Sequence, residues 1–207
     1  MKRIDHVVLA VRDLDAAAER LLRDHGLGSV PGGRHPAWGT VNRIVPLGDD
    51  YLELVAVEDP SVARATRFGR AIERLSADGD RWYAVCLADD DLEGTAARLG
   101  LSVSAGVRTR PDGIELRWRS AGVDADREDW LPFFIAWDVP PADHPGRAQA
   151  AHRVPVDGID RVELAGDPER LRAWVGDEDV PLYVDGDGAP RVRGVRVRVT
   201  GGGGLVL

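Results

Sequence analysis

One stretch of the sequence occurs twice at a fixed spacing. Residues 9–21 read LAVRDLDAAAERL and residues 87–99 read LADDDLEGTAARL, so the two stretches align with a constant offset of 78. In each, an apolar strand pattern ends at an aspartate, Asp13 or Asp91, which is a good N-cap for the amphipathic helix pattern that follows. An internal repeat of this kind indicates a fold built from copies of one module.

A shorter third copy lies near the end of the chain. IDHVVLA at 4–10 returns as IDRVELA at 159–165, with Arg161 in place of His6. Asp167 and Pro168 then form a favourable helix start. Extended segments follow each predicted helix, with turns at sequences such as RPDG (110–113). These segments are 27–38, 39–47 and 51–57, then 102–110, 114–121 and 130–137, and finally 180–184, 191–199 and 204–207.

The chain is therefore predicted to be an α+β protein with two full β-α-β-β-β modules and one reduced module. A separate amphipathic helix opens at Ser61 between the first two modules, with its apolar residues on one stripe. A proline-rich segment separates the second and third modules. The predicted boundaries are 1–59 for the first module, 60–80 for the inserted helix, 81–140 for the second module, 141–157 for the linker and 158–207 for the reduced module.

Composition limits the class of protein and its partners. With 207 residues, 43% hydrophobic and 30% charged, the chain is typical of a soluble globular protein, and its net charge of −8 argues against a general nucleic-acid binder. No apolar run reaches the roughly 18 residues of a membrane span. A strand directly after Met1 leaves no room for a signal peptide, and Cys86 is the single cysteine, so we expect a cytoplasmic protein without disulfides.

Several motifs resemble those of one superfamily. DHVVLAVRDLDAAA, GRHPAWGTVNRIVPLGDDYLELVAV (33–57), RPDGIELRWR and LPFFIAWD are similar to sequences of the vicinal oxygen chelate (glyoxalase/bleomycin-resistance) superfamily, and most of all to its glyoxalase-like domain family. The resemblance covers about 1–146. It implies that two modules pair into a curved, mostly antiparallel sheet around a cup-shaped pocket. Because the superfamily includes isomerases, lyases, dioxygenases and drug-sequestering proteins, the fold alone does not fix the reaction.

Strand alternation predicts which side chains face the cup. In the first strand, Val7, Leu9 and Val11 share one face, and His6 lies on the other with Val8 and Ala10. In the strand at 51–57, Leu52 and Leu54 share the aliphatic face, while Tyr51, Glu53 and Val55 share the opposite one. Because the aliphatic faces are expected to pack on helices, His6 and Glu53 are both predicted to project into the pocket.

By the resemblance, His6 and Glu53 occupy metal-ligand positions. An imidazole and a carboxylate suit Zn, Ni, Co, Mn or Fe(II); the alternative is a core histidine hydrogen-bonded to Glu53. The offset of 78 puts Ala84 at the position of His6, and the last strand of the second module has no carboxylate where the family pattern leads us to expect one, near Ala136. A four-ligand site shared by both modules is therefore excluded.

His35 is the best candidate for a third ligand or for a general acid or base. It lies in GGRHPAWGT, where glycines permit close approach and Pro36 keeps His35 extended. An exposed loop histidine is the alternative. We expect His25, His144 and His152 to be structural or solvated, and Cys86 to be a buried, unreactive thiol.

Further side chains are candidates for contacts with a substrate. Trp38, Trp82, Trp118 and Trp137 fall in or beside strands, and Thr40, Asn42 and Tyr51 are possible polar contacts. In IELRWRS, Arg117 and Arg119 alternate with a packed face. They would bind a carboxylate or phosphate if they faced the cup, and would be an ordinary solvated edge if they faced outward.

Two functions remain open at this stage. The first is a glyoxalase-like lyase or isomerase in which a divalent metal acts as Lewis acid on a small oxygen-rich metabolite, with Glu53 or His35 moving the proton. The second is a metal-free protein that encloses a small aromatic or amphipathic molecule. The reduced module is expected to leave an unmatched sheet edge, which favours a homodimer.

Overall fold

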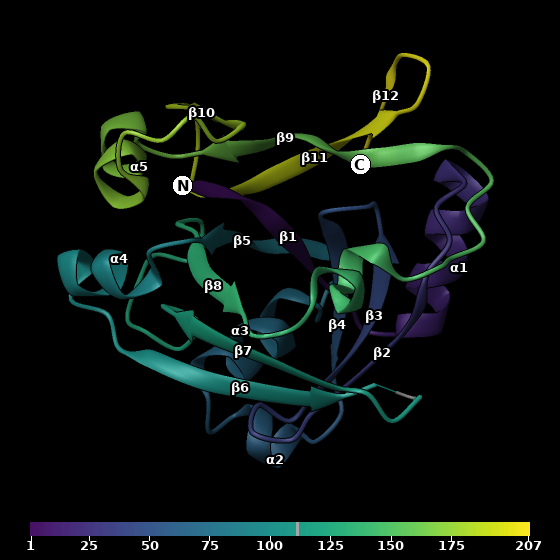
Figure 1. The fold of residues 1–207 in the computed structure, drawn as a ribbon, viewed down its shortest axis with the longest axis horizontal. Helices are drawn as coiled ribbons and strands as arrows, with labels where there is room; N and C mark the ends of the chain where they lie inside the picture. The colour runs from purple at the N-terminus through teal and green to yellow at the C-terminus, as the bar shows by residue number, and fades with distance from the viewer. Residues whose placement is uncertain (111) are drawn as a thin grey trace.

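The computed structural model describes residues 1–110 and 112–207, and it opens with the predicted module (Figure 1). The elements follow in the order β1 (Lys2–Ala10), α1 (Leu14–His25), β2 (Val30–His35), β3 (Thr40–Pro46) and β4 (Tyr51–Val57). The Asp13 carboxylate accepts hydrogen bonds from the backbone N–H groups of Asp15 and Ala16, so the predicted N-cap of α1 is present.

The second module repeats this order. It consists of β5 (Arg81–Asp89), α4 (Leu92–Leu99), β6 (Val103–Thr109), β7 (Glu115–Ala121) and β8 (Phe133–Trp137). Asp91 caps α4 by accepting from the backbone N–H of Gly94. Pro111, in the predicted RPDG turn, lies outside the described residues.

The predicted inserted helix is wrong in one respect, because it is two helices. These are α2 (Pro60–Ala63) and α3 (Arg67–Leu75). Thr66 between them has an extended backbone, and its hydroxyl accepts from the N–H of Gly69 to cap α3. The helix that begins at Pro60 therefore ends at Ala63, and a second helix begins after Thr66. Phe68 and Ile72 of α3 are buried against the concave face of the sheet.

The first two modules share one eight-stranded sheet with the order β2-β3-β4-β1-β5-β8-β7-β6. The modules meet through the antiparallel pair β1–β5, and within this sheet β1–β4 and β5–β8 are the parallel pairs among the described residues. The sheet curves until its edge strands β2 and β6 come into contact, as Figure 1 shows at the lower edge of the molecule. The predicted curved, mostly antiparallel sheet is confirmed.

The two faces of this sheet belong to different cores, as strand alternation predicts. Val7, Leu9 and Leu52 belong to a core outside the cup, together with α1 and the last module. Val8 and Val55 belong to an inner core with α3. The predicted orientation of β1 and β4 is therefore correct, and it directs His6 and Glu53 toward the cup.

The third module forms a separate sheet. It contains β9 (Val156–Ala165), α5 (Pro168–Val175), β10 (Leu182–Asp185), β11 (Arg191–Val199) and β12 (Gly204–Val206), with the strand order β10-β9-β11-β12. Its first strand pairs in parallel with β10, the strand directly after the helix, whereas β1 pairs with the last strand of its module. In Figure 1 this sheet lies above β1 and β5, on the outer side of the cup.

The segment predicted as a linker packs against the first module. Two short 3₁₀ turns at Pro141–Asp143 and Pro145–Arg147 interrupt it. Gly48 donates a backbone hydrogen bond to the carbonyl of Gly146 (2.9 Å), and the His152 imidazole contacts the carbonyl of Pro46 (2.9 Å). These contacts hold the segment against the end of β3 and the turn that leads to β4. No helix in the described part of the chain is both long and apolar enough to cross a membrane.

Candidate functional site

His6 and Glu53 meet on the concave face of the sheet. They come from the parallel neighbours β1 and β4, in which Val8 is the register partner of Glu53. Both side chains are buried, and Nε2 of His6 lies 3.6 Å from Oε2 of Glu53. This distance is too long for a hydrogen bond. The other Glu53 oxygen accepts a short hydrogen bond from the side-chain amide of Asn42 on β3.

Asp5 fixes the orientation of the His6 ring. The ladder between β1 and β5 is irregular between Ile4 and His6, so Asp5 departs from strict alternation. Its Oδ1 lies 2.6 Å from Nδ1 of His6. Trp137 Nε1 donates to Oδ2 at 2.9 Å, and His144 Nε2 lies 3.1 Å from the same oxygen.

Asp5 is held ionised by these contacts. Burial raises the pKa of its carboxyl, but the hydrogen bonds with His144 and His6 outweigh burial and hold the pKa well below its usual range. An ionised carboxylate only accepts hydrogen bonds, so Nδ1 of His6 carries the proton. In the neutral ring, Nε2 then presents its lone pair toward Glu53. A histidine that donates from one nitrogen to a carboxylate is the arrangement typical of a metal ligand.

Sequence reasoning did not identify Asp5 or His144 as site residues. Asp5 is next to His6 in the chain, and strict alternation assigns it to the other face of the strand. His144 was expected to be structural or solvated, and it contacts both Tyr51 and Trp137 at the edge of the site. Its only sequence signal is its place in a proline-rich segment, which says nothing about where that segment folds back.

His35 also lines the pocket and is buried. Its Nδ1 lies 3.2 Å from the hydroxyl of Thr40, and Trp38 packs edge-on against the ring. Burial lowers the pKa of His35 to about 4, although the nearby Glu53 carboxylate raises it in part. The imidazole is therefore uncharged at neutral pH. The alternative of an exposed loop histidine does not hold.

The pocket is lined by both polar and aromatic side chains. The candidates His6, His35, Trp38, Asn42, Tyr51, Glu53, Trp118 and Trp137 all line it, together with Phe68, Arg108, Ser120, Val123, Phe133 and Ile135. The hydroxyl of Thr40 contacts His35, and it is the His35 ring that lines the pocket. Trp82 instead packs in the outer core.

Arg117 and Arg119 do not face this pocket. The packed face of β7, which carries Trp118 and Ser120, lines the cup, so the two arginines project outward. Arg117 pairs with Glu115 at 2.6 Å, and Arg119 pairs with Glu93 and Asp138. The outward alternative therefore holds, and the expectation of an anion clamp at these positions is wrong. Arg161 is likewise away from the cup, paired with Glu163 at 2.9 Å.

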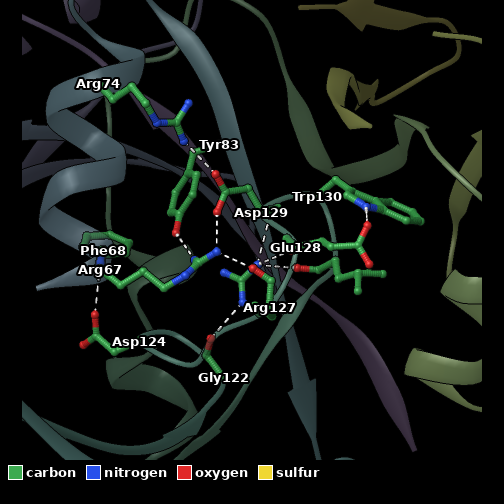
Figure 2. Close-up of polar contacts among 11 residues, drawn as sticks. Arg67, Phe68, Arg74, Tyr83, Gly122, Asp124, Arg127, Glu128, Asp129 and Trp130 are labelled. Atoms are coloured by element: carbon green, nitrogen blue, oxygen red, sulfur yellow. Dashed lines mark hydrogen bonds and ion pairs between the residues drawn. The ribbon is translucent and has the colours of Figure 1, made fainter. Parts of the chain in front are cut away.

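The loop between β7 and β8 covers one side of the pocket. Asp124 accepts hydrogen bonds from the Trp38 indole (2.7 Å) and from the backbone N–H of Phe68 (3.0 Å). Figure 2 shows how Arg127 holds the loop, with its guanidinium donating to the carbonyls of Gly122, Glu128, Asp129 and Leu131. Arg67 pairs with Asp129 at 2.8 Å and ties the loop to α3. These bonds fix Trp38 and Phe68 as pocket walls.

The pair His6–Glu53 has the chemistry of two metal ligands. A lone pair and a carboxylate oxygen that face each other repel unless a cation lies between them. Two ligands at about 2.1 Å from a tetrahedral ion stand ~3.4 Å apart, close to the observed 3.6 Å. The residues therefore fit a divalent ion with two protein ligands and with its other positions open.

A three-ligand protein cage around this pair is not preformed. Among the described residues, the group of three ligating side chains whose ligand atoms all lie within 4.8 Å of one another is Asp5, His6 and Cys86. Asp5 is committed to its three hydrogen-bond partners, and burial raises the pKa of the Cys86 thiol well above its usual value, which keeps it protonated and a poor ligand. His35 joins no such group.

The second module does not supply the missing ligands. Val8 pairs with Glu53 in the first module, and Cys86, its equivalent at the offset of 78, pairs with Phe133. The counterpart of Glu53 is thus Phe133, not a position near Ala136. Ala84 and Phe133 replace the ligand pair, and Phe133 packs edge-on against His6 at 5.6 Å.

The chain resembles solved structures along its length. A hypothetical protein from Staphylococcus aureus superposes with a TM-score of 0.75 at 15% identity, covering 98% of this chain and 93% of the other. A Streptomyces coelicolor methylmalonyl-CoA epimerase in complex with 2-nitronate-propionyl-CoA covers 66% of this chain and 98% of its own, with a TM-score of 0.48 and 19% identity. The Mycobacterium tuberculosis methylmalonyl-CoA epimerase gives a TM-score of 0.45 at 21% identity, covering 64% and 85%. At 15% identity, the likeness to the Staphylococcus aureus protein shows the fold alone.

No curated protein matches the chain. A family profile described as "Glyoxalase-like domain" matches residues 4–177, which is further than the 1–146 expected from sequence motifs and extends through α5. The match spans both full modules and the segment that carries His144. The chain therefore belongs to the glyoxalase-like domain family of the vicinal oxygen chelate superfamily.

Proposed function

We propose that this protein is a metal-assisted enzyme of the lyase or isomerase type, which moves a proton on a small oxygen-rich metabolite bound in the cup. The observation that carries the proposal is the His6–Glu53 pair, in which Nδ1 of His6 donates a hydrogen bond to Asp5 and Nε2 of His6 faces an oxygen of Glu53 at 3.6 Å. The bound metal is expected to be Zn, Ni, Co, Mn or Fe, and the location cytoplasmic.

The pocket residues have defined tasks in this proposal, and Glu53 has two, as ligand and as base. His6 and Glu53 hold a divalent ion, which supplies Lewis-acid stabilisation of negative charge on the substrate. Asn42 holds one Glu53 oxygen, so that the other remains directed into the pocket. Glu53 accepts the substrate proton. His35, uncharged and positioned by Thr40, offers a hydrogen bond to a substrate oxygen.

A second candidate function is a metal-free protein that encloses a small molecule between tryptophans. It is favoured by one observation, the substitution of Ala84 and Phe133 for ligands in the second module. Trp38, Trp118 and Trp137 would then form the binding surface.

Metal binding separates the two functions. We expect Zn²⁺, Co²⁺ or Ni²⁺ to raise the melting temperature of metal-stripped protein, because an ion at about 100 times its dissociation constant stabilises the folded state by roughly 2.7 kcal/mol. His6→Ala and Glu53→Gln should each abolish the shift. His25→Ala, a change at the end of α1, is the matched control and should retain it. Equal responses in wild type and both site variants would exclude the metal-assisted function.

A further inference from the structure

One buried arginine of the pocket is not used by the proposed function. Arg108 belongs to β6, an edge strand of the eight-stranded sheet, and its side chain passes over Gly33 of β2, the opposite edge. A Cβ at Gly33 would lie 2.8 Å from Cδ and 3.2 Å from Nη1 of Arg108. The glycine thus makes room for the guanidinium to reach the pocket lined by His35 and Glu53.

Arg108 has no anionic partner in the described part of the chain. Its exposed fraction is 5%, its Nη1 atom is buried without a hydrogen-bond acceptor, and it joins none of the ion pairs between described residues. Arg127 is equally buried, but its guanidinium donates to four backbone carbonyls. Arg127 therefore stabilises the loop that it binds, whereas Arg108 has no such structural role among the described residues.

A buried charge without a partner destabilises the folded protein, because it has lost its hydration and gained no counter-charge. Burial accordingly lowers the pKa of the Arg108 guanidinium, while the Tyr51 and Glu53 side chains raise it in part. An anionic group of a bound molecule would remove this cost. It would also receive paired N–H donors from the guanidinium.

We infer that Arg108 binds a carboxylate group of the ligand and so selects small carboxylic acids as substrates of the proposed reaction. The chemistry of the pocket favours a monoanion, because a single guanidinium faces the ligand and the Glu53 carboxylate lines the same pocket. In the metal-stripped protein, a dianionic phosphate would meet one cation and one anion. This inference rests on the proposed function for the reaction, but the carboxylate site itself does not depend on a metal.

The test uses benzoate, its neutral analogue benzamide, and phenyl phosphate, titrated by calorimetry into metal-stripped protein. Wild type is expected to bind benzoate at least tenfold more tightly than benzamide, and more tightly than phenyl phosphate. Arg108→Gln should reduce the benzoate preference at least tenfold, with Arg117→Gln on the outer face of the same sheet as the matched control. Equal binding of benzoate and benzamide, absence of binding by both, or a preference for phenyl phosphate would each overturn the inference.

The melting temperature of Arg108→Met distinguishes ligand recognition from a structural role. Removing an unpaired buried charge is expected to raise it in ligand-free protein while abolishing stabilisation by benzoate. A lower melting temperature with unchanged stabilisation by benzoate would show that Arg108 instead stabilises the contact between β6 and β2. If the benzoate preference holds but the metal response through His6 and Glu53 fails, the carboxylate site stands and the metal-assisted reaction does not.

Discussion

Two residues that lie next to each other in the chain divide the work at the centre of the site. His6 presents one nitrogen to the pocket, and Asp5 binds the other nitrogen from the side. Asp5 also forms hydrogen bonds with Trp137, which belongs to the second module, and with His144, which belongs to the segment after it. A single carboxylate therefore connects the candidate ligand to two distant parts of the chain.

This arrangement predicts that Asp5→Asn weakens metal binding without a change at the ligands. The neutral amide lowers the basicity of His6 and fixes its ring less firmly, so we expect metal affinity to fall by about 10–100-fold. Metal titration by calorimetry measures the change. Asp138→Asn, at an exposed carboxylate, is the control and should bind metal like wild type. Unchanged affinity in Asp5→Asn would show that the carboxylate does not act through His6.

At the scale of elements, the sequence predicts the regular features and misses the irregular ones. The faces of β1 and β4 follow from strict alternation, and the caps of α1 and α4 follow from Asp13 and Asp91. The irregular pairing at Asp5 breaks that alternation, and no residue type announces it. In β7 the alternation is clear, but it cannot tell which side of the sheet is the cup.

The position of Arg108 is a second feature that the sequence does not predict, because it depends on the closure of the whole sheet. In its strand, VSAGVRT, the apolar residues Val103, Ala105 and Val107 alternate with Ser104, Gly106 and Arg108, yet the apolar face is exposed and Arg108 is buried. Its role arises only because the sheet curves far enough to bring β6 against β2. A pattern read along one strand contains no information on that closure.

The turn between β3 and β4 joins the first module to the third through a partly buried carboxyl, that of Asp50. Both oxygens of Asp50 lie 3.0 Å from the backbone N–H of Ile159 on β9. Burial raises the pKa of Asp50 to about 7, although the hydrogen bond from Ile159 lowers it in part. The folded protein thus holds this proton more tightly than the unfolded chain.

Stability at this junction should therefore decrease as the pH rises from about 4 to about 7. Asp50→Asn keeps an oxygen acceptor for Ile159 and carries no charge at any pH. We expect the variant to gain about 1–2 kcal/mol of unfolding free energy relative to wild type between pH 5 and pH 8. Urea denaturation at both values measures this difference. If the unfolding free energy of wild type does not fall relative to that of the variant over this pH range, Asp50 does not titrate with a raised pKa.

At the scale of the whole molecule, the two sheets differ in how their edges are treated. The edges of the eight-stranded sheet, β2 and β6, lie against each other, whereas β10 and β12 end the four-stranded sheet. Both of these strands carry exposed apolar side chains, Tyr183 and Val206. An open, apolar strand edge favours pairing with a second chain.

We therefore expect a homodimer that forms through the four-stranded sheet. Val206→Lys should shift the protein toward monomer in sedimentation velocity, because a lysine on an edge strand opposes pairing. Val107→Lys, an equally exposed valine on β6, serves as the control and should remain dimeric. A wild-type monomer at high concentration would contradict the expectation.

The central claim is that His6 and Glu53 together hold a divalent ion. Anomalous diffraction from crystals soaked in Co²⁺ tests it most directly, because the signal locates the ion independently of any activity. We expect one strong peak per chain, about 2.0–2.2 Å from Nε2 of His6 and from an oxygen of Glu53. A pocket without a peak, or a peak beside Cys86 that leaves Glu53 uncoordinated, would contradict it.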